Sequence, residues 1–427
     1  MAAPGGKFYI QDKFAPVAAH HESFKQLWET KWKMPATMGV YPFMFGTAKD
    51  FEGIVDTLDK KGAKEPYDWN EWPTYFTPKA EELEGKAASA ASKGDKAEAA
   101  EYYFRSSVLY RFARFPIVRT EGQKHAWEKC KETAKKALVL KGEIGGYEPV
   151  REVLVPHPHA LEHEGKEIPI FHQLPAGASK ENPVPCVMIV TGLDGFRTEL
   201  VVWAEGWRQK NVAFACLEIP GTGDSPADPK DPLSPDRLFD SMTEWLGKQE
   251  AIDQKKIVAW GFSTGGYYTT RLAHTHPDKF AGVINLGGGF HHAFDPAWLD
   301  EVNHLEYPIG LADTLAHKWG YGDDTELFKK EASDKFSLLK DGTLDKPICA
   351  PLLLVNGTED EIFPIDDCYV ALQHGAPKLA RFVPGIKHMG EPESFFIIFK
   401  WIYKIFGIEG ANPGQQLGCN LNPSKYS

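Results

Sequence analysis

Short apolar runs alternate with helix-length segments over the last two-thirds of this 427-residue chain. The runs lie at residues 186–190, 212–217, 257–260, 282–286, 352–355 and 381–383. Most are rich in β-branched residues, and each is too short to form a helix of ordinary length. Such alternation is typical of strand-helix-strand units, so we predict a mostly parallel sheet that is covered by helices on both faces.

The first third of the chain has no strand-like runs. Its pattern is helical from about residue 25 to 140 and clearest over 81–114, where Leu, Tyr and Phe recur at three- and four-residue intervals between Ala, Glu and Lys. A stretch with several Gly and one Pro, residues 142–149, then breaks the pattern. Two further strand-like runs follow it, at 152–155 and 168–171, so a domain boundary falls within that stretch.

These patterns divide the chain into five predicted segments. Residues 1–148 form a helical cover domain, and 149–289 and 347–410 form two parts of the sheet domain. Residues 290–346 interrupt the alternation with Trp, His and charged residues. We predict there a lid-like insertion beside the C-terminal edge of the sheet, where such sheets bind their ligands. Residues 411–427 are polar and contain Gly and Pro, which indicates a loose C-terminal tail.

Charge and hydropathy exclude several classes of partner. The formal net charge is −11 and Lys and Arg do not gather in a basic block, so nucleic acid and anionic membrane surfaces are poor partners. Residues 1–7 contain no apolar stretch of signal-peptide length, and the longest apolar run, 184–190, is far too short to span a membrane. We therefore expect a soluble, cytoplasmic protein that acts on a small molecule.

The most specific local pattern is Gly-Phe-Ser-Thr-Gly at residues 261–265, directly after the apolar run at 257–260. A strand, a tight turn and a helix start are the context of a nucleophile elbow on the α/β-hydrolase fold. Glycines flank the serine because the turn is too crowded for side chains on either side. We predict that Ser263 is the nucleophile and that the amide of Thr264 points at the developing oxyanion. The pattern also occurs by chance, but its context favours the catalytic interpretation.

A serine hydroxyl is a weak nucleophile unless a histidine accepts its proton and an acid orients that histidine. On this fold the acid follows the serine in sequence and the histidine comes last. The run at 352–355 ends in a turn that carries Glu359, Asp360 and Glu361. We predict Asp360 as the acid because Ile-Phe-Pro follows it, as commonly follows the triad aspartate in these enzymes. The alternative is that all three are solvated turn acids.

The predicted base is His388, which lies on a loop 28 residues after Asp360. His291 and His292 also follow a strand end and could line a pocket, but they precede the acid in sequence. With Asp295 they allow a metal interpretation, which is weaker because the spacing is unfamiliar and no cysteine supports it. We therefore expect neither a metal nor any other cofactor.

The second oxyanion donor is expected in the glycine-rich turn Thr-Gly-Leu-Asp-Gly at residues 191–195. It follows the run at 186–190, and its glycines let a backbone amide, that of Leu193 or Asp194, approach the oxyanion. Asp194 has the alternative of being a plain turn residue. A similar loop at 221–225 is predicted to be structural rather than catalytic.

Motifs outside these residues carry a family resemblance over nearly the whole chain. They are Leu-Trp-Glu at 27–29, Val-Tyr-Pro-Phe at 40–43, Tyr-Arg-Phe-Ala-Arg-Phe-Pro at 110–116, Thr-Gly-Leu-Asp-Gly at 191–195, Glu-Ile-Pro-Gly-Thr at 218–222, Ser-Pro-Asp-Arg-Leu at 234–238, Gly-Gly-Tyr-Tyr at 265–268, Ala-His-Thr-His at 273–276 and His-Met-Gly at 388–390. With them the chain resembles the fungal polyketide-shortening hydrolases of melanin pathways, the yellowish-green pigment proteins. These belong to a wider group of esterase-like hydrolases with a helical N-terminal domain.

The resemblance implies hydrolytic cleavage of a carbon–carbon bond. The substrate would be an aromatic polyketide, a naphthopyrone or an acetylated polyhydroxynaphthalene, whose acyl side chain is shortened to give 1,3,6,8-tetrahydroxynaphthalene for melanin. The family's triad falls on Ser263, Asp360 and His388, and the family implies a homodimer. Thr264 departs from its relatives, which have alanine after the nucleophile; the amide survives that change, but the added hydroxyl alters the pocket.

Two other functions stay open at this stage. A carboxylesterase or lactonase would use the same triad on a different leaving group, and a non-catalytic binding protein could keep the fold alone. Aromatic residues of the insertion could line a pocket for a flat polyphenol, although aromatics at helical spacing are more often core residues. They are Trp298, Trp319, Tyr321 and Phe328.

Overall fold

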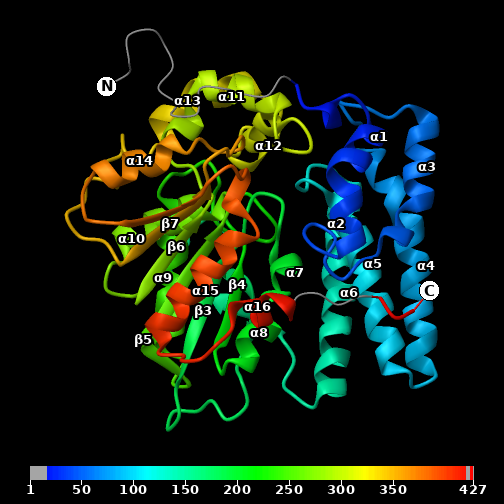
Figure 1. The fold of residues 1–427 in the computed structure, drawn as a ribbon, viewed down its shortest axis with the longest axis horizontal. Helices are drawn as coiled ribbons and strands as arrows, with labels where there is room; N and C mark the ends of the chain where they lie inside the picture. Colours follow the sequence, from blue (N-terminus) through cyan, green and yellow to red (C-terminus); the bar gives the residue numbers. More distant parts are fainter. Residues whose placement is uncertain (1–16, 420–423, 427) are drawn as a thin grey trace.

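Within the described residues, eight strands form one sheet in the order β1-β2-β4-β3-β5-β6-β7-β8 (Figure 1). The strands are β1 (Arg151–Pro156), β2 (Glu167–Gln173), β3 (Val184–Val190), β4 (Ala213–Leu217), β5 (Ile252–Phe262), β6 (Gly282–Leu286), β7 (Leu352–Gly357) and β8 (Leu379–Val383). β2 pairs antiparallel with β1 and β4, and the other pairs are parallel. Each predicted apolar run overlaps a strand, and only residue 212 lies outside one, which confirms the predicted fold class.

The computed structural model describes residues 17–419 and 424–426. The segment 1–7, from which the absence of a signal peptide was predicted, lies outside these residues, as do 420–423 and 427 of the predicted tail. In the part of the chain that is described, no helix combines the length and the apolar character needed to cross a bilayer.

Helices cover both faces of the sheet. One face holds α9 (Ser234–Gly247) and α10 (Gly265–Thr275), and the other holds α8 (Trp203–Gln209) and α15 (Glu393–Phe406) (Figure 1). In α15 the buried positions recur at three- and four-residue intervals and meet the aromatic rings of α8 and β5. The remaining helices of the sheet domain are α7 (Arg197–Leu200), α14 (Asp366–Gln373) and α16 (Pro413–Gly418).

The N-terminal helices form a bundle that stands beside the sheet (Figure 1). They are α1 (Phe24–Leu27), α2 (Lys33–Met38), α3 (Glu52–Lys61), α4 (Trp72–Ser92), α5 (Lys96–Arg114) and α6 (Glu121–Gly145). The long helix α5 packs between α4 and α6, and every residue from 102 to 114 is buried. Asp95 caps the start of α5, and α6 begins with a capping box formed by Thr120 and Gln123.

The segment between β6 and β7 forms α11 (Pro296–Glu301), α12 (Leu311–Lys318) and α13 (Thr325–Phe336). These helices lie above the C-terminal ends of the strands, beside the top of the helical bundle (Figure 1). The aromatic residues considered as pocket lining are all buried, and Trp319 packs against Phe336 with ring centroids 4.2 Å apart. They therefore contribute to the core of the insertion.

The predicted loose tail is held in place where it is described. Helix α16 packs against α8, and its Gln416 is 1% exposed and accepts a hydrogen bond from Tyr403. Further on, the backbone amides of Lys425 and Tyr426 donate to Glu101 of α5 at 3.0 and 3.2 Å. The expectation of a loose tail was wrong here because these tertiary contacts outweigh the polar, Gly- and Pro-containing composition.

Candidate active site

Ser263 lies in the turn between β5 and α10 and has an unusual backbone conformation. Its φ of 51° is in the left-handed region, which residues with a side chain rarely adopt. The Ser263 amide donates to the carbonyl of Leu286 in β6 at 2.8 Å, and its own carbonyl accepts from Gly266 at 2.7 Å. The neighbouring strand and the start of α10 thus hold the strained residue in place.

Both glycines that flank the serine are required by close backbone approach. A Cβ atom on Gly261 would lie 2.4 Å from the carbonyl oxygen of Gly265. A Cβ atom on Gly265 would lie 2.3 Å from the carbonyl oxygen of Thr191 and 2.4 Å from that of Val190. Such distances are far inside van der Waals contact, so the elbow can form its tight turn and pack against the end of β3 only when these side chains are absent.

His388 links the serine to an acid in a continuous hydrogen-bonded chain. The hydroxyl of Ser263 and Nε2 of His388 are 2.8 Å apart, and the Nδ1–H of His388 donates to Oδ2 of Asp360 at 2.8 Å. The three side chains come from the turn after β5, the turn after β7 and the loop after β8. The structure therefore brings together the three residues that were predicted as a triad, although they are 125 and 28 residues apart in sequence.

Asp360 is fully buried and its carboxylate is saturated with donors. Oδ1 accepts the amides of Ile362 at 2.7 Å and Phe363 at 3.0 Å, and Oδ2 also accepts from Nδ2 of Asn356 at 2.8 Å. Of the other acids in the turn, Glu359 is exposed and Glu361 pairs with Lys387. The contact with His388 distinguishes Asp360 from both.

Two more carboxylates surround His388. Burial alone would lower the pKa of His388, but the charge and hydrogen bond of Asp360, together with Glu306 and Glu391, raise it above its ordinary value. Glu306 accepts the backbone amide of His388 at 3.1 Å, and burial raises its pKa while Lys31 opposes this. Burial raises the pKa of Glu391 to about 7, against the effect of His388.

Sequence reasoning missed both of these carboxylates. Glu306 lies in the insertion, where no periodicity marks it, and its contact with His388 spans 82 residues. Glu391 follows His388 by three positions on the same loop. That proximity was a local signal that could have found it.

The turn at 191–195 lies directly against the elbow. A Cβ atom on Gly192 would be 3.0 Å from the carbonyl oxygen of Phe262 and 3.4 Å from Cβ of Ser263. Among the described residues, the backbone amides of Thr264, Leu193 and Asp194 have no hydrogen-bond partner. The three predicted oxyanion donors thus have no backbone acceptor among the described residues, and the hydroxyl of Thr264 is also buried without a described partner.

Asp194 is more than a plain turn residue. Its carboxylate accepts hydrogen bonds from the hydroxyl of Tyr41 at 2.6 Å and from that of Tyr307 at 2.9 Å. Its carbonyl accepts from Nη1 of Arg114 at 2.7 Å. Burial raises the pKa of Asp194, and the two tyrosine hydroxyls oppose the shift. Two of these partners, Tyr41 and Arg114, lie in motifs that the sequence already singled out.

Both of the paired histidines have hydrogen-bond partners. Nδ1 of His291 lies 2.7 Å from the hydroxyl of Ser337, and Nδ1 of His292 lies 2.8 Å from Asp295. Across the described part of the chain, no group of three or more His, Cys, Asp or Glu side chains is arranged to hold a metal ion.

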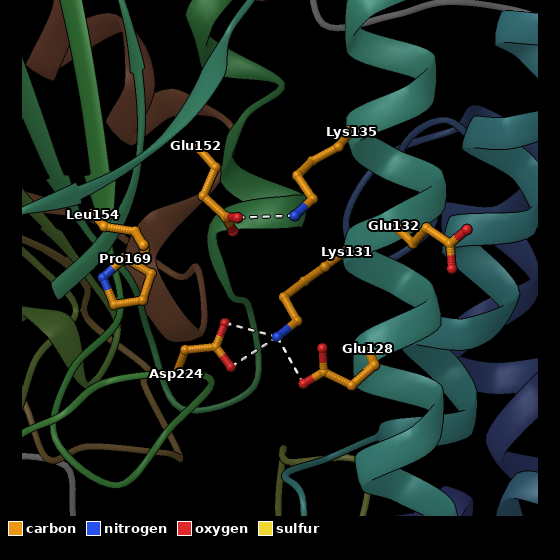
Figure 2. A pocket seen from close by; sticks show the side chains of 8 residues that line it. All are labelled: Glu128, Lys131, Glu132, Lys135, Glu152, Leu154, Pro169 and Asp224. Atoms are coloured by element: carbon orange, nitrogen blue, oxygen red, sulfur yellow. Dashed lines mark hydrogen bonds and ion pairs between the residues drawn. The ribbon is translucent and has the colours of Figure 1, made fainter. Parts of the chain in front are cut away.

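A separate cavity of about 430 Å³ opens between α6 and the sheet (Figure 2). Its lining includes Asp224, which forms ion pairs with Lys131 at 3.0 Å and with Arg197 at 2.7 Å. Glu152 pairs across the same space with Lys135 at 2.8 Å. The pairs of Lys131 and Lys135 join the helical bundle to the sheet domain, and the contacts of Asp224 fit the structural role predicted for the loop at 221–225.

The sheet topology and the serine at a strand-to-helix elbow define an α/β-hydrolase. Comparison with known protein families matches residues 71–384 to the family described as Esterase FrsA-like. The protein therefore belongs to the esterase FrsA-like family, and it is an esterase-like hydrolase.

Curated relatives agree with this assignment. The chain is 22% identical to esterase FrsA of Photobacterium profundum over 78% of its own length and 75% of the relative's. It is 23% identical to esterase FrsA of Salmonella paratyphi B, over 62% of the chain and 60% of that relative.

Two solved structures share the fold. The 2,6-dihydroxy-pseudo-oxynicotine hydrolase is 19% identical with a TM-score of 0.63, covering 84% of this chain and 93% of that one. AbyA5 is 17% identical with a TM-score of 0.60, covering 88% of this chain and 98% of that one.

Proposed function

We propose that the protein is a serine hydrolase that shortens the acyl side chain of an aromatic polyketide by cleaving a carbon–carbon bond. The observation that carries the hydrolase part is the hydrogen-bonded chain from Ser263 through His388 to Asp360. The polyketide part is supported by the resemblance to the fungal pigment hydrolases. The proposed substrate is a naphthopyrone or an acetylated polyhydroxynaphthalene.

The first half of the reaction is acyl transfer to the serine. Ser263 Oγ attacks the side-chain ketone while Nε2 of His388 takes the hydroxyl proton, and Asp360 stabilises the imidazolium. The amides of Thr264 and of the 192–194 turn receive the oxyanion. When the intermediate collapses, the bond between the carbonyl carbon and the ring breaks, and its electron pair goes to the ring.

Carbon is normally a poor leaving group, but phenol groups on the ring delocalise the negative charge. The imidazolium of His388 then gives its proton to the ring carbon, which completes the release of the shortened polyphenol. Water, deprotonated by His388, hydrolyses the acyl-serine to a short carboxylic acid. The raised pKa of His388 suits both tasks, because the imidazole is a stronger base and still a competent acid near neutral pH.

Ester hydrolysis is the second candidate, and the family assignment favours it. An ester differs from the ketone only in its leaving group, so the same three residues would perform both reactions. The two functions therefore differ in the substrate that is turned over.

The two functions are separated by incubating the purified protein with a naphthopyrone, an acetyl-tetrahydroxynaphthalene and a simple aryl ester. The released acid is identified by mass spectrometry, with Ser263→Ala as the matched control. Acetate or acetoacetate from the aromatic ketones, at a rate above that on the ester, supports the proposal. Turnover of the ester alone would establish an esterase, and full activity of Ser263→Ala would refute both.

The resemblance also implies a homodimer. Light scattering on the purified protein tests this, with a mass near twice 47.7 kDa as the expected result.

A further inference from the structure

The turn that faces Ser263 is fixed by side chains from outside the sheet domain. Tyr41 follows α2 in the helical bundle, Arg114 ends α5 of the same bundle, and Tyr307 precedes α12 of the insertion. All three converge on Asp194, two on its carboxylate and one on its carbonyl oxygen. A single turn of the sheet domain is thus held by both of the segments that cover it.

A second set of contacts holds Tyr41 and Arg114, the two residues of the helical bundle that contact Asp194. Arg111 donates to the carbonyl of Pro42, directly after Tyr41, and pairs with Glu199 at 2.9 Å. Arg114 also pairs with Glu199 and lies over the Phe196 ring, 3.6 Å from its centroid. Both arginines therefore pair with the buried carboxylate of Glu199, and Arg114 also reaches the Asp194 carbonyl, so one ion-paired cluster fixes the bundle side of the turn.

The insertion contributes through Tyr307, whose ring stacks on Phe115 at 6.5 Å with an interplanar angle of 23°. Phe115 follows α5, so the helical bundle and the insertion meet where they contact Asp194. Tyr41 also touches the turn itself, because a Cβ atom on Gly195 would lie 3.2 Å from its ring. The turn has little room to move while both covers are in place.

We infer that Asp194 is a positioning residue, through which the helical bundle and the insertion set the place of the oxyanion-binding amides relative to Ser263. This inference rests on the proposed acyl transfer. Oxyanion donors act only at hydrogen-bond distance from the developing charge, and a displacement of about 1 Å can cost about a hundredfold in rate. The helical bundle and the insertion therefore contribute to catalysis. This role explains why the sequence motifs around Tyr41 and Arg114 contain these side chains.

The test removes the anchoring hydroxyls without changing the shape of the side chains. The variants Tyr41→Phe, Tyr307→Phe and the double variant are compared with Tyr75→Phe, which loses a tyrosine hydroxyl on α4 that contacts Lys61. The measurements are kcat and KM on an aryl ester, inhibition by an aryl trifluoromethyl ketone that forms an oxyanion on serine, and thermal unfolding.

We expect kcat to fall about tenfold in each single variant and about a hundredfold in the double variant, with KM within about threefold of wild type. Ketone inhibition should weaken by the same factors, whereas Tyr75→Phe should match wild type. The single variants keep one hydroxyl on Asp194 and should unfold within about 3 °C of wild type. Unchanged kcat and ketone inhibition in the double variant would overturn the inference.

A rise in KM with kcat unchanged would also overturn it, because the tyrosines would then bind substrate directly. A different outcome would refute the proposed acyl transfer to Ser263. It fails if Ser263→Ala retains turnover and the ketone does not inhibit the wild-type protein, whatever the tyrosine variants do.

Discussion

Exchange of Asp360 for asparagine is the sharpest test of the hydrogen-bonded chain. The two side chains have the same shape, but an amide has one acceptor oxygen and one donor nitrogen where the carboxylate has two acceptors. Asp360 uses Oδ1 for the amides of Ile362 and Phe363, and Oδ2 for Asn356 and His388. Neither orientation of an asparagine can satisfy all four donors.

The orientation that keeps the two backbone bonds turns the new NH2 group toward His388. Nδ1 of His388 must then accept a hydrogen bond, which moves the imidazole proton to Nε2, where it faces Ser263 and cannot take the serine proton. In serine hydrolases this tautomer error costs about 10⁴-fold in kcat. At 1.36 kcal/mol for each factor of ten, the loss is about 5 kcal/mol of transition-state stabilisation.

The measurement is kcat and kcat/KM of Asp360→Asn on an aryl ester across pH 5 to 9, with circular dichroism to confirm folding. Because Asp360 raises the pKa of His388, and activity requires the neutral imidazole, the acidic limb of the residual activity should also move to lower pH. The control is Glu359→Gln, which changes an exposed acid of the same turn. A folded Asp360→Asn protein with kcat within tenfold of wild type would refute the reasoning.

Three further substitutions test the packing and the charges. Gly265→Ala places a Cβ atom 2.4 Å from the carbonyl oxygen of Val190, the last residue of β3, so it should cost about 1–3 kcal/mol in the free energy of unfolding, measured with urea. Lys318 is buried with Tyr268 as its hydrogen-bond partner, and burial lowers its pKa far below the ordinary value. The charged form of Lys318 therefore opposes folding, so Lys318→Met should be the more stable protein at pH 7, with an advantage that shrinks as the pH approaches 10; an advantage constant with pH would contradict this. Burial raises the pKa of Glu391 to about 7, so its charged form opposes folding; Glu391→Gln should match wild type near pH 4 and be more stable at pH 8, by urea unfolding at both values.

Local patterns were sufficient to predict the sheet and the three residues of the hydrogen-bonded chain. The elbow can be recognised in the sequence because an apolar strand is followed directly by a serine between two glycines. Asp360 and His388 can be recognised because each follows an apolar run that predicts a strand. The C-terminal ends of parallel strands meet at one edge, so these residues had to approach one another. The distances and hydrogen bonds between these residues depend on the tertiary structure, so local sequence patterns could not predict them.

Contacts made by the insertion could not be predicted from the sequence. Glu306 and Tyr307 are adjacent in a segment of short helices without strong periodicity, yet one contacts His388 and the other Asp194. Tyr41 and Arg114 were visible only as parts of motifs, since their common target is 153 and 80 residues away. Helix α16 was missed because its stability comes from contacts with α8 and Tyr403, and its own sequence is a poor helix former.

The unbroken burial of α5 from residue 102 to its end at residue 114 has a consequence for how much change this protein tolerates. A helix with one solvent face accepts substitutions on that face, so its tolerance rises and falls every three or four positions. From 102 to 114 there is no solvent face. Random mutagenesis should therefore reveal an unbroken run of intolerant positions, and α5 should be the segment in which engineered diversity is most costly.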